Sequence, residues 1–218
     1  MTDVRTSHIV WDWNGTLLDD NDVVLAAVNE VCVGFGRTAL TWDEWRELYA
    51  RPLRRTYEHL LDRVLTDEDW ALIDRLYHER YDLQLHTCGL AKGVPDQLHA
   101  WSASGRTQSL LSMWFHAQLV PTVERFGLTE LFRRVDGLTT EVGGDSKAEH
   151  LVNHLRAQDL DPTEVLVIGD VVDDALAAEA AGARSILVAT GAMSRAALER
   201  TGVPVADSIT EALQLLER

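Results

Sequence analysis

The sequence is poor in cysteine and in long apolar runs, and each shortage excludes a class of protein. Cys32 and Cys88 are the only cysteines among 218 residues, and they are far apart and in no metal-ligand spacing. We therefore expect two reduced core thiols rather than a disulfide framework or a zinc site. No segment approaches the ~18 apolar residues that a membrane span needs. The first residues also lack the basic stretch and apolar run of a signal peptide, so we expect a soluble cytoplasmic protein.

Positive charge is also scarce. The 20 Lys and Arg residues face 35 Asp and Glu residues, which gives a formal net charge of −15. Nucleic acid is excluded as an expected partner, because a polyanion would be repelled rather than attracted. A small anionic substrate stays compatible with this charge if a metal ion or a local cationic pocket receives it. Lys92 and Lys147 are the only lysines, so each is a candidate for a specific role.

The order of apolar patterns predicts an α/β fold. The run His8–Trp11 ends at Asp12 and a turn, which is typical of a buried strand. Residues 20–91 then show only helical signals, including a capping box at 41–44. Further strands are predicted at 107–112, 134–137, 165–168 and 185–188, with helices between them. Strands that alternate with helices predict a doubly wound parallel sheet. We expect a Rossmann-like core of residues 1–19 and 92–218 with an inserted helical cap, 20–91.

Ligands bind at the carboxyl ends of the strands in such a sheet, and polar residues gather there in this sequence. These residues are Asp12, Asn14, Thr16, Ser112, Lys147, Asp170, Asp173 and Asp174. Carboxylates with one hydroxyl and one ammonium suit a hard divalent cation and an anion beside it. A phosphoryl group in transfer carries negative charge that such groups neutralise, and an ionised Asp12 can attack phosphorus.

These residues also follow the order of a known family's motifs. Asp12-Trp13-Asn14-Gly15-Thr16 resembles the first motif, Asp-x-Asp-x-Thr, of the haloacid dehalogenase superfamily. Ser112 stands where that family has its second motif, Lys147 where it has its third, and 169–174 resembles its fourth. The order fits from about His8 to the end of the chain. The helical block lies where the family's first type of cap is inserted, as in its phosphoglycolate-phosphatase-like branch.

The resemblance implies a role for each position and a Mg²⁺ cofactor. Asp12 would be the nucleophile and a metal ligand, with the backbone carbonyl of Asn14 and the side chain of Asp170 as further ligands. Asp174 would complete the metal site or hold Lys147, and Asp173 could share that task. Thr16 would order the loop, while Ser112, its neighbour Met113 and Lys147 would bind a small phosphorylated substrate. A monomer and a homodimer are equally compatible with the sequence.

Asn14 departs from the family pattern. The family's phosphatases have an aspartic acid there, which protonates the leaving oxygen and later deprotonates the attacking water. An amide does neither, and the loss of a general acid or base typically costs roughly 10²–10⁴-fold in rate. Several readings stay open: a leaving group that needs no proton, such as an acyl or anomeric phosphate; a proton from the cap or solvent; a weakly active or silent phosphate-ester binder; or an engineered trap variant.

Two other chemistries of the family are less compatible with the sequence. The phosphonate-cleaving branch uses a cap lysine, but the cap helices contain none and Lys92 lies at the predicted hinge. The metal-free 2-haloacid dehalogenases have no use for the carboxylates around Asp170, although this activity stays an alternative. His150 and His154 are one helical turn apart, but no third ligand accompanies them, so we expect surface residues.

The cap offers one candidate for substrate recognition. Arg51, in the cluster Arg51-Pro52-Leu53-Arg54-Arg55, falls where this cap type presents a loop to the substrate and could bind an anionic group. The alternative is a solvated helix face paired with acids such as Glu58. Trp13 and Trp114 flank the predicted site and form either its walls or part of the core, and core packing is favoured. In a wall, Trp13 would contact the substrate, so it is included among the candidate substrate-binding residues. Cap hinges are expected at 18–20 and 91–93.

Overall fold

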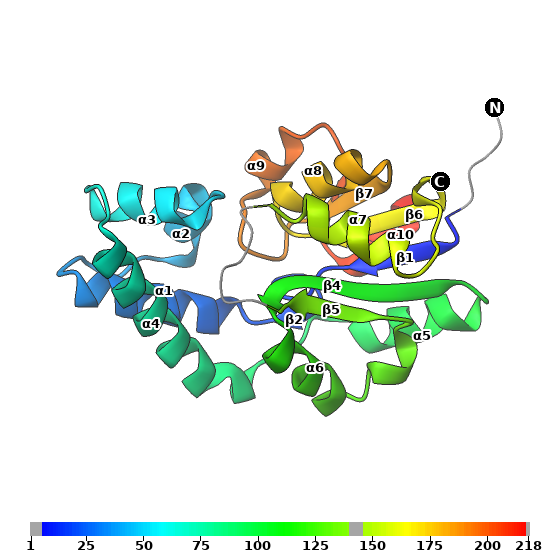
Figure 1. Cartoon of the computed structure of the whole chain (residues 1–218), viewed down its shortest axis with the longest axis horizontal. Helices are drawn as coiled ribbons and strands as arrows, with labels where there is room; N and C mark the ends of the chain where they lie inside the picture. Colours follow the sequence, from blue (N-terminus) through cyan, green and yellow to red (C-terminus); the bar gives the residue numbers. More distant parts are fainter. Residues whose placement is uncertain (1–5, 140–145, 217–218) are drawn as a thin grey trace.

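A six-stranded parallel sheet forms the centre of the computed structural model, which describes residues 6–139 and 146–216 (Figure 1). The strand order is β5-β4-β1-β6-β7-β8, and each neighbouring pair is parallel. This confirms the predicted doubly wound α/β sheet. The strands are β1 His8–Trp11, β4 Thr107–Phe115, β5 Val135–Leu138, β6 Val165–Gly169, β7 Arg184–Val188 and β8 Val205–Ala206.

Alternating side chains of the strands pack under helices on both faces of the sheet. Ile9 and Trp11 belong to the apolar cluster on one face, whereas Val10 belongs to the cluster on the other. The first face is covered by α5 Val94–Ala103, α6 His116–Arg125 and α10 Ile209–Leu216, and the second by α7 Ala148–Arg156, α8 Val172–Ala181 and α9 Arg195–Glu199. Short 3-10 turns span Thr129–Leu131 and Pro162–Glu164. The sheet is thus buried on both sides, as a parallel sheet requires.

A helical block lies at one end of the sheet, on the left in Figure 1. It contains α1 Asn21–Gly34, α2 Trp42–Leu48, α3 Leu53–Leu61 and α4 Asp67–Gln84, followed by the 3-10 turn Leu85–Thr87. Its own apolar cluster includes Val31, Trp45 and Ile73. The capping box predicted at 41–44 is present, with Glu44 N donating to Thr41 Oγ1 over 3.3 Å.

Two chain crossings join this block to the core, and they pair with each other. β2 Leu18–Asp19 and β3 Gly89–Leu90 form an antiparallel ribbon, and Ala91 N donates to Leu17 O over 2.9 Å. β2 falls within the predicted hinge 18–20, whereas β3 ends directly before the predicted hinge 91–93. Movement of residues 20–91 as a cap stays a prediction.

Three local expectations from the sequence need correction. β4 extends to Phe115 rather than Ser112, with an irregular register between Leu111 and Phe115. The sequence predicts a helix over 174–181, but α8 begins at Val172, and it predicts a helix over 146–158, but α7 begins directly after Lys147. These differences move element ends by two or three residues, and the candidate residues stay at the same edge of the sheet.

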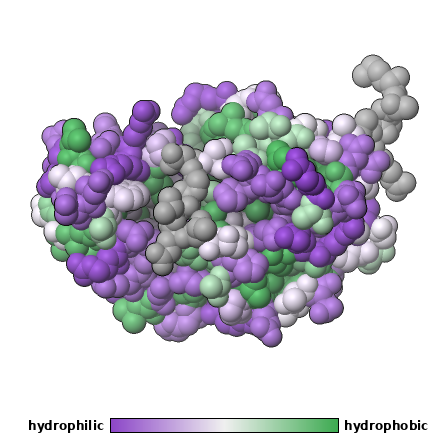
Figure 2. Space-filling model, viewed as in Figure 1, coloured by the Kyte–Doolittle hydropathy of each residue, from purple (hydrophilic) through white to green (hydrophobic). Residues whose placement is uncertain are grey.

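The surface contrasts with this apolar interior. Hydrophilic residues dominate the face shown in Figure 2, with hydrophobic ones scattered among them. The large hydrophobic residues that are exposed in the described chain, such as Val64 and Leu176, lie apart in sequence. Of the helices in the described ranges, none is both long and apolar enough to cross a membrane.

Candidate active site

Three carboxylates meet at the carboxyl ends of the two central strands. Asp12 follows β1, Asp170 follows the neighbouring strand β6, and Asp174 lies in the first turn of α8. All three are buried, and one oxygen of each lies within 4.8 Å of the others. Gly169 permits this arrangement, because a Cβ there would lie 2.1 Å from Asp174 Oδ2. The parallel topology thus gathers residues that are 158 positions apart, 12 against 170.

Lys147 links two of these carboxylates. Its Nζ lies 2.5 Å from Asp12 Oδ1 and 2.7 Å from Asp174 Oδ1, and the residue is 2 % exposed. Its backbone N–H donates to Asp173 Oδ2 over 2.9 Å, so Asp173 holds the start of α7 in place. Burial alone would lower the pKa of Lys147, but Asp12 and Asp174 raise it above its usual value. The ammonium therefore stays charged beside Asp12.

Three buried carboxylates surround the single ammonium of Lys147, and this excess of negative charge favours the binding of a cation. Burial raises the pKa of Asp12 to about 6, although the ammonium of Lys147 opposes the shift. Burial and the nearby Asp12 and Asp174 raise the pKa of Asp170. Buried carboxylates of this kind are stabilised by a divalent cation, and their oxygens are the ligands that Mg²⁺ prefers. The residues present therefore fit a magnesium site.

Close backbone contacts hold Asp170 in its position. Ala192 N donates to Asp170 Oδ2 over 2.7 Å, and Thr16 Oγ1 lies 3.4 Å from Asp170 Oδ1. Gly191 packs against the same carboxylate, since a Cβ there would lie 1.9 Å from Oδ2. Thr16 is fully buried, and the loop-ordering role that the family resemblance implies for it stays a prediction.

The Asn14 amide is fixed by two residues that sequence reasoning did not single out. Its Nδ2 donates to Asp20 Oδ2 and to the Tyr81 hydroxyl, each over 2.8 Å. Tyr81 in turn donates to Asp20 Oδ2 over 2.8 Å, and Gly15 N donates to Asp20 Oδ1 over 2.9 Å. Burial raises the pKa of Asp20, while these hydrogen bonds oppose the shift. Because both amide protons of Asn14 are used, its side chain presents only an acceptor.

The helical block closes over these groups and leaves a cavity of about 240 Å³ between itself and the core. The cavity lining includes four residues that the sequence predicts to contact substrate, Ser112, Met113, Lys147 and Arg51, and Arg51 is exposed to solvent. Their contact with substrate stays a prediction. Ser112 Oγ accepts a hydrogen bond from Trp114 N over 3.1 Å, which leaves the hydroxyl proton available to an anion.

The two tryptophans that flank the site differ in their placement. Trp114 lines the cavity. Trp13 is fully buried in the core with its ring 6.2 Å from that of Phe126, and it is absent from the cavity wall. The prediction that the Trp13 side chain contacts substrate is therefore wrong, and the favoured alternative of core packing is what the structure has. The alternation of β1 explains this, since its odd-numbered residues face the core of α5 and α6.

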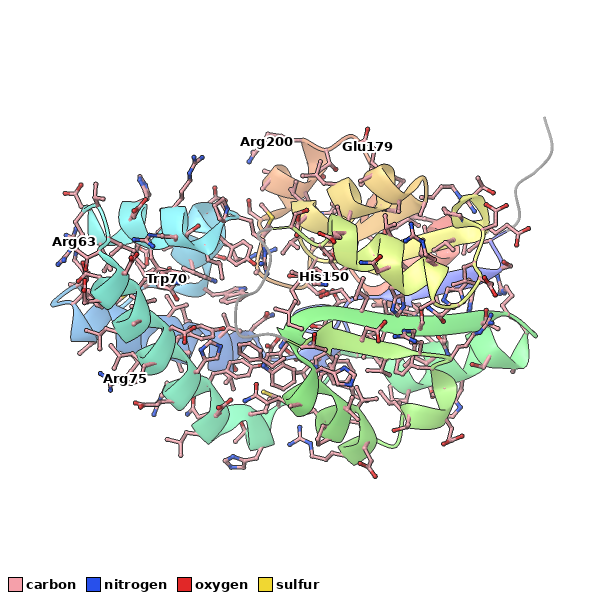
Figure 3. The ribbon with its side chains drawn as sticks, viewed as in Figure 1. Arg63, Trp70, Arg75, His150, Glu179 and Arg200 are labelled. Atoms are coloured by element: carbon pink, nitrogen blue, oxygen red, sulfur yellow. The ribbon has the colours of Figure 1, made fainter. Side chains whose placement is uncertain are left out.

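Aromatic residues form much of the cap side of the cavity. All four tyrosines of the chain and four of its seven tryptophans line it. Figure 3 shows Trp70 between α3 and α4, whereas Arg63 and Arg75 lie on the outer side of the cap. The lining aromatics are Trp42, Trp45, Tyr49, Tyr57, Trp70, Tyr77, Tyr81 and Trp114. Sequence reasoning missed this clustering, because helical spacing within the cap does not show which residues face the core.

One prediction about histidine is also wrong. His154 is 1 % exposed rather than on the surface, with its ring nitrogens 2.7 Å from Asp136 Oδ2 and 2.8 Å from Ser109 Oγ. His8 contacts the same Ser109 Oγ over 2.8 Å, and burial lowers the pKa of His8 to about 4. This buried polar cluster ties α7 to the sheet behind Lys147. His150 is half-buried on the same helix (Figure 3).

Comparison with known proteins identifies the family. The model of the haloacid dehalogenase-like hydrolases matches residues 9–188, so the chain belongs to this family and is a hydrolase of its phosphatase type. A phosphoglycolate phosphatase from Photobacterium profundum is 31 % identical over 190 residues, which cover 79 % of each chain. A phosphoglycolate phosphatase from Agrobacterium fabrum is 25 % identical over 187 residues, or 84 % of this chain and 80 % of the relative.

Solved structures share the fold. A predicted phosphatase from Clostridium acetobutylicum superposes with a TM-score of 0.84 at 16 % identity, covering 98 % of this chain and 100 % of the other. A haloacid dehalogenase-like hydrolase from Streptococcus pneumoniae superposes with a TM-score of 0.81 at 19 % identity, covering 96 % of this chain and 97 % of the other. The matches span the sheet and the helical block together.

Proposed function

We propose that the protein is a Mg²⁺-dependent phosphatase that hydrolyses a small phosphorylated metabolite, with Asp12 as the nucleophile. The observation that carries this proposal is the gathering of Asp12, Asp170 and Asp174 within 4.8 Å, with Lys147 bridging two of them. The names of the phosphoglycolate phosphatase relatives support phosphate-ester hydrolysis. They also make phosphoglycolate the first substrate to try.

Some side chains of the site would bind the phosphoryl group, and one would attack it. Lys147 and the Ser112 hydroxyl bind its oxygens, so that the carboxylate of Asp12 faces phosphorus and forms an aspartyl-phosphate. Asp12, the Asn14 backbone carbonyl and Asp170 would hold Mg²⁺, and Asp174 would support the site together with Lys147. When bound, Mg²⁺ supplies positive charge that lets an anionic nucleophile approach an anionic substrate. Asp170 and Asp12 then serve as ligands without having to be protonated.

The alternative of a catalytically silent phosphate-ester binder is favoured by one observation. Asn14 replaces the family's acidic residue, and both protons of its amide are donated to Asp20 and Tyr81. The metal-free dehalogenase alternative has no such support, since three buried carboxylates are costly to assemble around a reaction without a cation.

One assay separates these functions. Phosphate release from para-nitrophenyl phosphate, an activated ester, is measured with Mg²⁺ and with a chelator for the native chain, Asp12→Asn and Asp170→Asn. We expect release that needs Mg²⁺ and disappears in Asp12→Asn, with calorimetric Mg²⁺ binding weakened in Asp170→Asn. Native chain that binds Mg²⁺ and an unreactive phosphonate analogue without releasing phosphate would favour the silent binder. Halide release from a 2-haloacid in the presence of chelator would favour the dehalogenase.

A further inference from the structure

The aromatic lining of the cavity forms two continuous series of ring contacts that begin beside the reacting groups. One series runs from Tyr49 through Trp45 and Tyr57 to Trp70, with ring centroids 5.6, 6.0 and 6.1 Å apart. The other includes Tyr77, Tyr81 and Trp114, with stacked and edge contacts at 5.9 Å. The hydroxyl of Tyr81 is bonded to Asn14, so the second series starts at the catalytic loop. Trp45, Tyr57 and Tyr81 are buried, whereas the half-buried rings of Tyr49, Trp70 and Tyr77 offer flat apolar surface to the group that is attached to the phosphoryl group.

The same cavity offers little to a charged leaving group. Within the described part of its lining, Arg51 is the one lysine or arginine that the cap contributes, and Asp74 brings a negative charge. A small carboxylate such as glycolate would leave most of the aromatic surface uncovered. Its carboxylate would also lose hydrating water against those rings, and contact with apolar rings does not compensate for the free energy of that desolvation. A ring attached to phosphate through oxygen would instead bury apolar area against aromatic faces.

The Asn14 loop points to the same class of substrate for an independent reason. Asp20 accepts three hydrogen bonds, from Gly15 N, Asn14 Nδ2 and the Tyr81 hydroxyl, so its oxygens are occupied as acceptors. Asn14 has no proton left to give. Neither side chain can therefore protonate a leaving oxygen without breaking this arrangement. The substrate must then carry a leaving group that is stable as an anion.

We propose, on the basis of the phosphatase function above, that the substrate is an aryl phosphate, the monoester of a phenol-like ring. The bond from an Asp12 oxygen to phosphorus forms as the bond from phosphorus to the phenolic oxygen breaks, and that electron pair leaves with the phenolate. Water then bonds to phosphorus, and the pair of the Asp12–phosphorus bond returns to the carboxylate. Both water protons remain on the phosphate, from which one passes through solvent to the phenolate.

Four esters test the lack of a proton donor and the preference for ring surface separately, with kcat/KM measured in Mg²⁺. Phenyl and benzyl phosphate carry the same ring, but phenol, with a pKa of about 10, is a far stronger acid than benzyl alcohol. If no side chain protonates the leaving oxygen, phenyl phosphate should be preferred by at least about 100-fold. Naphthyl phosphate matches phenyl phosphate in its leaving group but offers more ring surface. It should be preferred over phenyl phosphate, and phenyl phosphate over phosphoglycolate.

Matched variants test the ring surface. Tyr77→Leu and Trp70→Leu each remove a half-buried ring from the cavity lining, and Phe35→Leu removes a half-buried ring of the same cap outside it. Tyr77→Leu should lower kcat/KM for naphthyl phosphate by about tenfold, the size of a lost aromatic contact. Trp70→Leu should lower it less, because this ring lies farther along its series. Phe35→Leu should change it by less than twofold and should keep its activity toward phosphoglycolate. In Tyr77→Leu and Trp70→Leu the loss should be larger for naphthyl phosphate than for phosphoglycolate.

The outcomes distinguish failure of the aryl phosphate assignment from failure of the proposed phosphatase function. Benzyl phosphate hydrolysed within about threefold of phenyl phosphate would reveal a proton donor, such as the cavity-lining His78, and would overturn the aryl assignment. Preference for phosphoglycolate over both aryl esters would also overturn it. No phosphate release from any ester would instead remove the proposed phosphatase function itself.

Discussion

The core side of the cavity is held together by hydrogen bonds and ion pairs, whereas its cap side is built from ring contacts. On the core side, Asp12, Lys147 and Asp174 form a buried chain with distances of 2.5 and 2.7 Å. On the cap side, the rings of Tyr57 and Trp45 are tilted against each other with their centroids 6.0 Å apart. Directional contacts fix the position of a reacting atom, while ring contacts accept related shapes. We therefore propose that the core side carries out the chemistry and that the cap side selects the substrate.

Removal of the Lys147 charge should have the largest effect and would show whether the core side depends on that ion pair. Lys147→Met leaves Asp12 and Asp174 buried without their partner, so kcat should fall by about 10²–10³-fold. The free energy of unfolding should fall by roughly 3–5 kcal/mol in a chelator. Mg²⁺ should restore part of that stability, because it binds the same carboxylates. Retained turnover would show that the lysine is not needed for the phosphoryl group.

An exchange of charge between Asn14 and Asp20 should have the next largest effect. Asn14→Asp alone places two carboxylates in hydrogen-bond contact at a 2.8 Å position, so it should gain little activity and lose stability. Asn14→Asp combined with Asp20→Asn restores a single carboxylate, now at the family's acidic position. Turnover of benzyl phosphate by the double variant should rise by up to about 10²-fold. Equal gains in the single and double variants would contradict the hydrogen-bonded arrangement seen here.

A smaller effect is expected from crowding the carboxylates. Gly169→Ala would push Asp174 aside, because the added Cβ would lie 2.1 Å from its Oδ2. Displacement of such a supporting residue should weaken Mg²⁺ binding by about 10–100-fold, measured by calorimetry. Gly89→Ala is the matched control, since a Cβ there would have no neighbour within 4 Å. An unchanged affinity in Gly169→Ala would mean that Asp174 does not take part in the metal site.

The smallest effect should come from a contact between Arg46 of the cap and a loop of the core. Arg46 of α2 donates to Met193 O over 2.7 Å and to Ala189 O over 3.0 Å, both in the core loop that also holds Asp170. Arg46→Gln should cost roughly 1 kcal/mol of cap closure, or about fivefold in kcat/KM. Mg²⁺ affinity should stay the same. A matching loss of Mg²⁺ affinity would contradict this expectation and would show that the cap and the metal site are coupled.

The core side could be predicted almost entirely from the sequence, because its residues either follow recognisable strands, as Asp12 and Asp170 do, or lie at the starts of helices, as Lys147 and Asp174 do. The run Val165–Ile168 predicts a strand that ends just before Asp170. Because this strand is parallel to the one that ends before Asp12, both residues lie at the same edge of the sheet. Element ends were less predictable: β4 continues past Ser112 to Phe115 because its register shifts there. His154 was misjudged because its partners, Asp136 and Ser109, lie on two other elements.

By itself, then, the sequence determined the sheet, the inserted helical block and the carboxylates with their lysine. Local patterns of apolar residues and turns decide these features, and each leaves a signal within a few neighbouring positions. Only the tertiary structure decided that Tyr81 meets Asn14, that Trp13 lies in the core and that the cap turns its rings toward the cavity. Such contacts depend on how distant helices pack, and periodicity along one helix carries no record of its partner.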